Sequence, residues 1–100
     1  MTDQTIQVRE NPEQARFDVL VDGELAGFTE YHPHPADAGV RVFPHTEVFP
    51  DFEGRGLSKP LIREALDATR AAGLRVVPQC PAVARFIEKN PDYADLVASV

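Results

Sequence analysis

The hydrophobic period of the chain changes at residue 56, and this change restricts the folds that the sequence can adopt. Before it, Phe17, Val19 and Val21 alternate with polar residues at period two, which is typical of a half-buried strand. After it, small and apolar residues share one helical stripe: Leu57, Leu61, Ile62, Ala65, Leu66, Thr69 and Ala72. The sequence therefore predicts strands in the first half and an amphipathic helix directly after residue 56.

The first half is expected to form four strands, at 6–10, 16–22, 25–31 and 40–48. Asp22-Gly23 supplies the positive φ angles of a tight hairpin turn between the second and third strands. We expect a loop over 32–37, because each of its prolines fixes φ and lacks an amide donor. Pro44 requires an irregularity or an edge position within the fourth strand.

The second half is expected to contain two main helices. Pro60 is tolerated only in the first turn of a helix, so the first helix begins at about Leu57 or Ser58 and ends near Gly73. A short strand at 74–77 follows. The second helix then runs from Cys80-Pro81 to a stop at Pro91, with these residues on its apolar side: Val83, Phe86 and Ile87.

The last segment, 92–100, has room for one more helical turn, with Tyr93, Leu96 and Val97 able to face inward. The predicted fold is a mixed α+β one, with a mostly antiparallel sheet and the element order ββββαβα. A chain of 100 residues has room for one core, so we expect a single domain over 1–100.

Composition and charge exclude several classes of function. A formal net charge of -6 is the wrong sign for a general nucleic-acid binder, although a small anion can still be held at a helix N-terminus. The single cysteine, Cys80, has no disulfide partner, which fits a reducing cytoplasm. Neither a signal peptide at 1–5 nor a membrane span is expected, because no apolar run is long enough. His32 and His34 lack a carboxylate or cysteine at ligand spacing, so no metal site is expected.

The segment that joins the two halves has the composition of an anion site. Gly54 and Gly56 let the backbone amides turn toward a ligand, and the amides at the helix start add a partial positive charge. Arg55 and Lys59 could supply countercharge. The alternative is a tight turn that uses glycine for geometry alone. A dinucleotide fingerprint is not supported, because its third glycine position is Lys59.

With these residues in view, the chain resembles the small single-domain members of the GCN5-related N-acetyltransferases. Their loop pattern, Gln/Arg-x-x-Gly-x-Gly/Ala, is matched over 51–56 except at Asp51. The segments His45-Thr46-Glu47-Val48 and 77–81 look like the signature of the small subgroup.

The resemblance implies a function, a cosubstrate and a binding site. The expected activity is transfer of an acetyl group from acetyl-CoA to an unidentified amine, by a monomer or weak dimer. The coenzyme A pyrophosphate would lie on the backbone amides of Gly54, Arg55, Gly56, Leu57, Ser58 and Lys59. Val48 would flank the pantetheine arm, where two neighbouring strands separate.

Three residues are candidates for catalysis. Cys80 is the expected N-cap of the second helix, where the helix dipole favours a thiolate, so it can act as nucleophile or proton donor. His45 is a candidate base or thiol partner, and Glu47 a candidate base. The structural alternatives are a small buried hydrophobe for Cys80, a strand histidine bonded to a carbonyl for His45, and a solvated carboxylate for Glu47.

The family that the chain resembles often uses a tyrosine on the last helix as the acid. Phe86 and Ile87 occupy the corresponding positions here, so the resemblance leaves Cys80, or Tyr93, to protonate the departing thiolate. Two other functions stay open at this point. One is a coenzyme A or acyl-CoA binding module without catalysis, and the other is a protein interaction domain in which 54–56 forms a structural turn.

Overall fold

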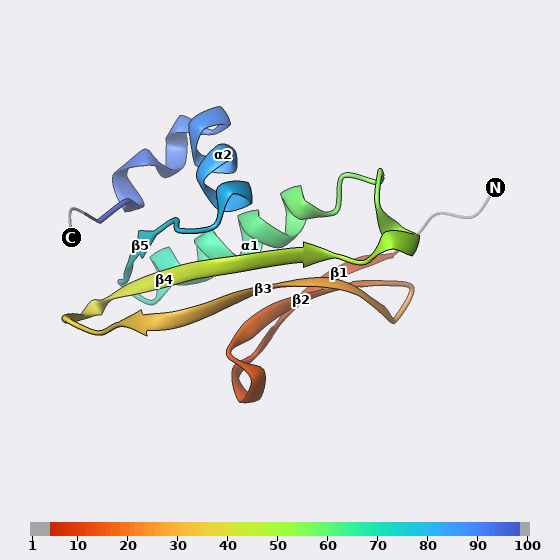
Figure 1. Cartoon of the computed structure of the whole chain (residues 1–100), viewed down its shortest axis with the longest axis horizontal. Helices are drawn as coiled ribbons and strands as arrows, with labels where there is room; N and C mark the ends of the chain where they lie inside the picture. The colour runs from red at the N-terminus through yellow and green to blue at the C-terminus, as the bar shows by residue number, and fades with distance from the viewer. Residues whose placement is uncertain (1–4, 99–100) are drawn as a thin grey trace.

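The computed structural model describes residues 5–98 and contains a five-stranded sheet with two α-helices packed on it (Figure 1). The strands are β1 (Ile6–Asn11), β2 (Arg16–Val21), β3 (Glu24–His34), β4 (Asp37–Val48) and β5 (Arg75–Val77). The helices are α1 (Ser58–Ala71) and α2 (Pro81–Lys89), with three 3-10 helices, η1 (Pro12–Gln14), η2 (Pro50–Phe52) and η3 (Pro91–Leu96). The predicted fold class and element order are confirmed, and the 3-10 helices η1 and η2 are additional.

The strands follow one another in the sheet in chain order, from β1 to β5. The first four are antiparallel, and β5 pairs in parallel with β4 at Val40, Arg41 and Val42 alone. After this short contact the chain leaves the sheet toward α2, while β4 continues to Val48 (Figure 1). The last backbone bond between the two segments runs from the Cys80 amide to the Phe43 carbonyl, at 2.8 Å. Beyond it, β4 and the β5–α2 segment separate.

The proline in β4 coincides with the irregularity that the sequence predicts. Glu30 pairs with His45 and His32 pairs with Val42, so one residue of β3 faces two residues of β4, including Pro44. Such a bulge removes the need for a ladder donor at the proline.

The loop predicted over 32–37 is shorter than expected, because Pro35 and Ala36 alone lie between β3 and β4. β3 extends to His34, β4 begins at Asp37, and Pro33 pairs with Arg41. The fixed φ of proline is compatible with extended backbone, and a second register shift beside Pro33 accommodates the missing donor.

The shorter hairpin agrees with the prediction. Asp22 and Gly23 connect β2 to β3 with φ angles of 51° and 85°. Both values lie in the left-handed region that a two-residue hairpin turn requires.

Helix α1 has the predicted limits. It begins at Ser58, with Pro60 in its first turn, and ends at Ala71. Gly73 has a φ of 76° and lets the Leu74 amide bond back to the Thr69 carbonyl at 3.0 Å, which satisfies a terminal carbonyl.

One hydrophobic core joins both helices to the sheet through these residues: Phe17, Val19, Val21, Ala26, Phe43, Phe52, Leu57, Leu61, Ile62, Ala65, Leu66, Val76, Cys80, Val83, Phe86, Ile87 and Leu96.

The predicted last turn forms as η3, with Leu96 buried and Tyr93 packed against the core. Val97 differs from the prediction, because its side chain is exposed and its backbone forms a bridge to Val76. Main-chain pairing with the edge of β5, and not burial of its side chain, therefore holds Val97 in position. Residues 1–4 and 99–100, which enter the predictions for the two ends of the chain, lie outside the described residues.

A test of the sheet uses Gly27, where a Cβ would meet the carbonyl oxygen of Glu47 and lie 3.0 Å from the Cα of Val48. Gly27→Ala is expected to lower the free energy of unfolding by about 1–3 kcal/mol, because β3 and β4 must move apart. In Gly39→Ala, the matched control, the Cβ meets only the end of the Asp37 side chain, at 3.3 Å. Urea unfolding followed by circular dichroism measures both variants, and an equal loss in the two would contradict this account.

Candidate active site

The loop before α1 has the conformation that an anion site needs. Gly54 and Gly56 have φ angles of 82° and 70°, and no atom lies within 4 Å of a Cβ built at either position. These positions therefore need glycine because of their positive φ angles. A Cβ atom there would meet no neighbouring atom.

The amides at the start of α1 are available to a ligand. Leu57 is the N-cap and makes no side-chain cap bond. Within residues 5–98, the amides of Gly56, Leu57 and Ser58 donate to no carbonyl or side chain, and the Lys59 amide makes a long 3.4 Å contact with the Gly56 carbonyl. Unpaired amides and the helix dipole together favour a negatively charged group here.

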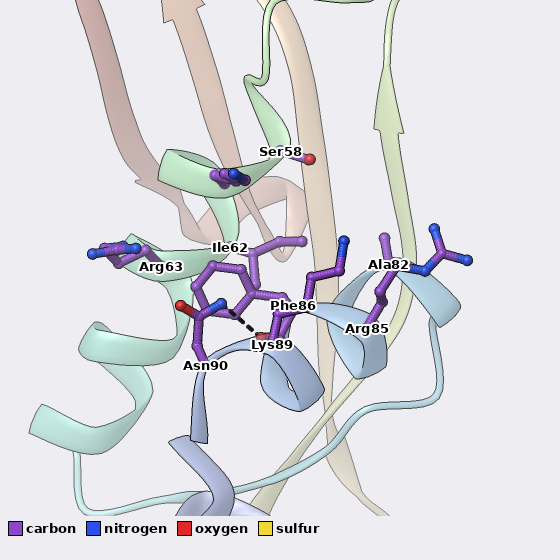
Figure 2. Close-up of a pocket in the computed structure, with 9 residues that line it drawn as sticks. Ser58, Ile62, Arg63, Ala82, Arg85, Phe86, Lys89 and Asn90 are labelled. Atoms are coloured by element: carbon purple, nitrogen blue, oxygen red, sulfur yellow. Dashed lines mark hydrogen bonds between the residues drawn. The ribbon is translucent and has the colours of Figure 1, made fainter. Parts of the chain in front are cut away.

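A cleft of about 290 Å³ lies between the first half of α1 and α2. Ile62 and Phe86 face each other across its floor in Figure 2. Its lining residues are Ser58, Lys59, Ile62, Arg63, Ala82, Arg85, Phe86, Lys89 and Asn90. This lining contains both lysines of the chain, two arginines and no carboxylate, although the chain as a whole has a net charge of -6. A concentration of positive charge against the average suits an anionic ligand.

Of the predicted anion-binding residues, Ser58 and Lys59 line this cleft. Arg55 does not, because its guanidinium lies 5.2 Å from the Phe52 ring centre and donates to the Asp51 carbonyl at 3.4 Å. It lines a separate cavity that three carboxylates surround, those of Asp22, Glu24 and Asp51. The Leu57 side chain belongs to the core, so Leu57 can contact a ligand only through its backbone.

Sequence reasoning missed three cations of the cleft, Arg63, Arg85 and Lys89. Their spacing contains a signal that could have found them. Lys59 and Arg63 are four residues apart on one helix, and Arg85 and Lys89 are four apart on the next. Like charges at this spacing repel each other across one helical turn, so two such pairs indicate a site that a ligand neutralises.

Cys80 is the N-cap of α2, as predicted, and its side chain is 5% exposed. Its Sγ donates to Oγ1 of Thr46 at 3.4 Å, and that oxygen shares a 2.8 Å hydrogen bond with Oγ1 of Thr29. The thiol therefore lies where β4 and the β5–α2 segment separate, beside a hydroxyl of β4.

The structure does not bring His45 to Cys80. Nε2 of His45 lies 3.2 Å from Oε1 of Glu47, and both side chains are about half exposed, at 53% and 46%. Successive residues of a strand point to opposite faces, so His45 and Glu47 lie on the face away from Thr46. Thr46 takes the place beside the thiol that the sequence interpretation gave to His45. Val48, also predicted to contact the ligand, is half-buried at the end of β4.

Residues 5–98 contain neither a cluster of metal ligands nor a helix suited to crossing a membrane. No group of three or more His, Cys, Asp or Glu side chains is placed to hold a metal ion. None of the helices in the same range combines the length and the apolar character that crossing a membrane requires.

A family model for the GCN5-related N-acetyl-transferases matches residues 16–96. The chain belongs to this family. No curated protein matches the chain significantly. The match covers the sheet from β2 onward, the glycine loop, both helices of the cleft and Cys80.

Solved structures of other GCN5-related N-acetyltransferases have the same fold. The NMR structure of a Staphylococcus aureus protein assigned as a GCN5-like N-acetyltransferase has a TM-score of 0.68 and 18% identity, over 94% of this chain and 89% of that one. A Desulfovibrio desulfuricans protein assigned to the same family has a TM-score of 0.58 and 25% identity, over 74% of this chain and 52% of that one.

A third structure is the ribosomal-protein-alanine N-acetyltransferase of Brucella melitensis biovar Abortus 2308. It has a TM-score of 0.53 and 24% identity, over 85% of this chain and 62% of that one. The present chain therefore has nearly the length of the Staphylococcus aureus protein and spans about half to six-tenths of the other two.

The cleft predicts binding of inorganic pyrophosphate. Pyrophosphate at ten times its Kd is expected to raise Tm by roughly 5 °C or more at constant ionic strength, because it binds the native state alone. The double variant Lys59→Gln/Arg85→Gln should lose most of this shift. Arg9→Gln is the control, since Arg9 lies on exposed β1 and its side chain hydrogen-bonds only to that of Gln7 among the described residues. Equal shifts in the control and the double variant would exclude the cleft as the site.

Proposed function

We propose that this chain transfers an acetyl group from acetyl-CoA to an amine. Family membership supports acetyltransferase activity in general. The observation that carries the proposal is the carboxylate-free cleft, with four cations, at the open N-terminus of α1. One wall of the cleft is α2, which begins directly after the point where β4 loses its parallel neighbour.

The residues of the cleft fit the phosphates of coenzyme A. A diphosphate carries about two negative charges, and the unpaired amides of the glycine loop can approach its oxygens closely. We assign the backbone from Gly54 to Lys59 to this group, which includes the main chain of Arg55 and Leu57. The side chains of Lys59 on α1 and Arg85 on α2, the two helices that line the cleft, add countercharge.

The outer edge of β4 fits the remainder of the ligand. Between Phe43 and Val48, β4 has no strand beside it on the β5 side within the described residues. Free amides and carbonyls at such an edge can bind an extended amide-containing chain as an additional strand would be bound. We therefore place the pantetheine arm along this edge, with Val48 beside it. When bound, the coenzyme supplies a thioester whose carbonyl accepts an amine.

The chain's own residues would position the reactants and move protons. Cys80, at the separation point, holds a proton on Sγ that it can give to the departing thiolate. As an alternative the Cys80 thiolate can attack the thioester carbonyl and displace the coenzyme A thiolate, which forms an acetylated cysteine; attack of the amine on this acetyl group then releases the cysteine thiolate. The half-exposed pair of His45 and Glu47 can accept a proton from the incoming ammonium through water, from the opposite face of β4.

Substitution of Cys80 tests this function. Cys80→Ser and Cys80→Ala are expected to lower kcat/KM about 100-fold in an assay with a panel of primary amines, because no group remains to assist thiolate departure. The Kd of acetyl-CoA, measured by calorimetry, should change by less than about threefold, since neither variant alters the cleft. Wild-type turnover in both variants would rule out a role for the thiol.

The same assay separates an enzyme from a binding module. Intact mass recorded after incubation of the wild-type chain with acetyl-CoA reports an acetylated Cys80 if the thiol is a nucleophile. Tight coenzyme binding without turnover on any amine, and without a mass change, would favour a coenzyme A binding module. Absence of binding would overturn the proposal.

A further inference from the structure

A chain of two hydroxyls leads from the core of the sheet to the Cys80 thiol. Thr29 of β3 is fully buried, with 0% exposure, and its Oγ1 lies 2.8 Å from Oγ1 of Thr46 on β4. Cys80 Sγ lies 3.4 Å from the same Thr46 oxygen and is itself 5% exposed. Three polar groups from three segments therefore form one connected path out of a mostly apolar core.

A buried hydroxyl at Thr29 is not needed to fill the space. Its register partner on β2 is the buried Phe17, and valine has nearly the same shape as threonine. Thr69, the other buried polar residue among those described, bonds to the Ala65 carbonyl of its own helix, as threonines in helices often do. Thr29 instead bonds to a second hydroxyl that faces a thiol.

We propose that Thr46 is a positioning residue that sets the orientation and ionisation of Cys80, with Thr29 as its support. This inference rests on the proposed role of Cys80 in acetyl transfer. In the thiol state, S–H donates to Thr46 Oγ1, and the Thr46 hydroxyl donates to Thr29. In the thiolate state both hydroxyls rotate, so that Thr29 donates to Thr46 and Thr46 donates to the sulfur. Either direction of the Thr29–Thr46 bond is compatible with the observed 2.8 Å distance.

Among the described residues, no charged side chain forms a hydrogen bond with the Cys80 thiol. His45 and Glu47 on β4 bond to each other on the opposite face of the sheet, and Glu30 of β3 pairs with His45 on that same face. Arg85, on α2, lines the cleft between the helices. Thr46 makes the one side-chain hydrogen bond that the described structure gives to Cys80.

A purely structural role is the competing explanation. Thr29 and Thr46 are directly opposite in the β3–β4 register, and cross-strand threonine pairs stabilise sheets by hydrogen bonding. That role predicts a change in stability when either hydroxyl is removed, but no change in the titration of the thiol. The titration therefore distinguishes the two explanations.

The experiment records thiolate absorbance at 240 nm against pH in the apo protein. The chain has one cysteine, so the signal below pH 10 reports Cys80. Ionisation of tyrosine, which would interfere with this signal, is shifted to higher pH. Burial and a hydrogen bond to Glu10 raise the pKa of Tyr31 to about 12. Burial and a hydrogen bond to Asp67 likewise raise the pKa of Tyr93. Cys80→Ser supplies the baseline.

Thr46→Val is expected to move the titration midpoint upward by about one pH unit, because it removes a hydrogen bond to the charged sulfur. Thr46→Ser keeps the hydroxyl and should titrate as the wild type does. Thr29→Val should give a smaller upward shift in the same direction. If Thr46→Val does not fold, the shift in Thr29→Val decides the question.

Identical midpoints in the wild type and the valine variants would overturn this inference and leave the proposed acetyl transfer untouched. Conversely, a shifted midpoint in Thr46→Val together with full activity in Cys80→Ser would support the hydroxyl path and refute the role of the thiol. Under the full account, Thr46→Val also lowers kcat about tenfold with an unchanged KM for acetyl-CoA, and Thr46→Ser restores it.

Discussion

The arrangement of the proposed site depends on the short parallel contact between β4 and β5. The contact spans Val40 to Val42 on β4 and is closed by one bond from the Cys80 amide to the Phe43 carbonyl. A longer ladder would occupy the edge of β4, and a shorter one would not fix the start of α2. The end of this pairing leaves the edge of β4 free. It also places the Cys80 thiol and the N-terminus of α2 beside that edge.

The charge distribution also reflects the proposed function. The chain has a net charge of -6, yet four of its ten lysines and arginines meet in one cleft that contains no carboxylate. Like charges four residues apart on α1 and on α2 repel each other, which costs folding stability while the cleft is empty of anions. A phosphate ligand would neutralise this repulsion, which supports the proposed anion site.

Local chemistry made most of the fold predictable, and tertiary contacts decided the rest. Pro60 and Gly73 delimit α1, and Asp22-Gly23 specifies a hairpin, because each requirement acts over a few residues. The loop over 32–37 is shorter than predicted because proline is compatible with an extended strand. At the site, the glycine loop was visible in the sequence. Arg63, Arg85 and Lys89 meet only when two helices pack together, and Thr46 is recognised only after the sheet places Cys80 beside it.

The most direct test of this account is an NMR titration of isotope-labelled protein with acetyl-CoA. The account predicts that the largest amide shifts fall on Gly54, Gly56, Leu57 and Ser58, followed by those on the cleft side of α2, because these groups surround the assigned phosphate position. Saturation of these shifts at one equivalent would place the coenzyme at the mouth of α1. Shifts confined to other elements, or none at all, would contradict the account.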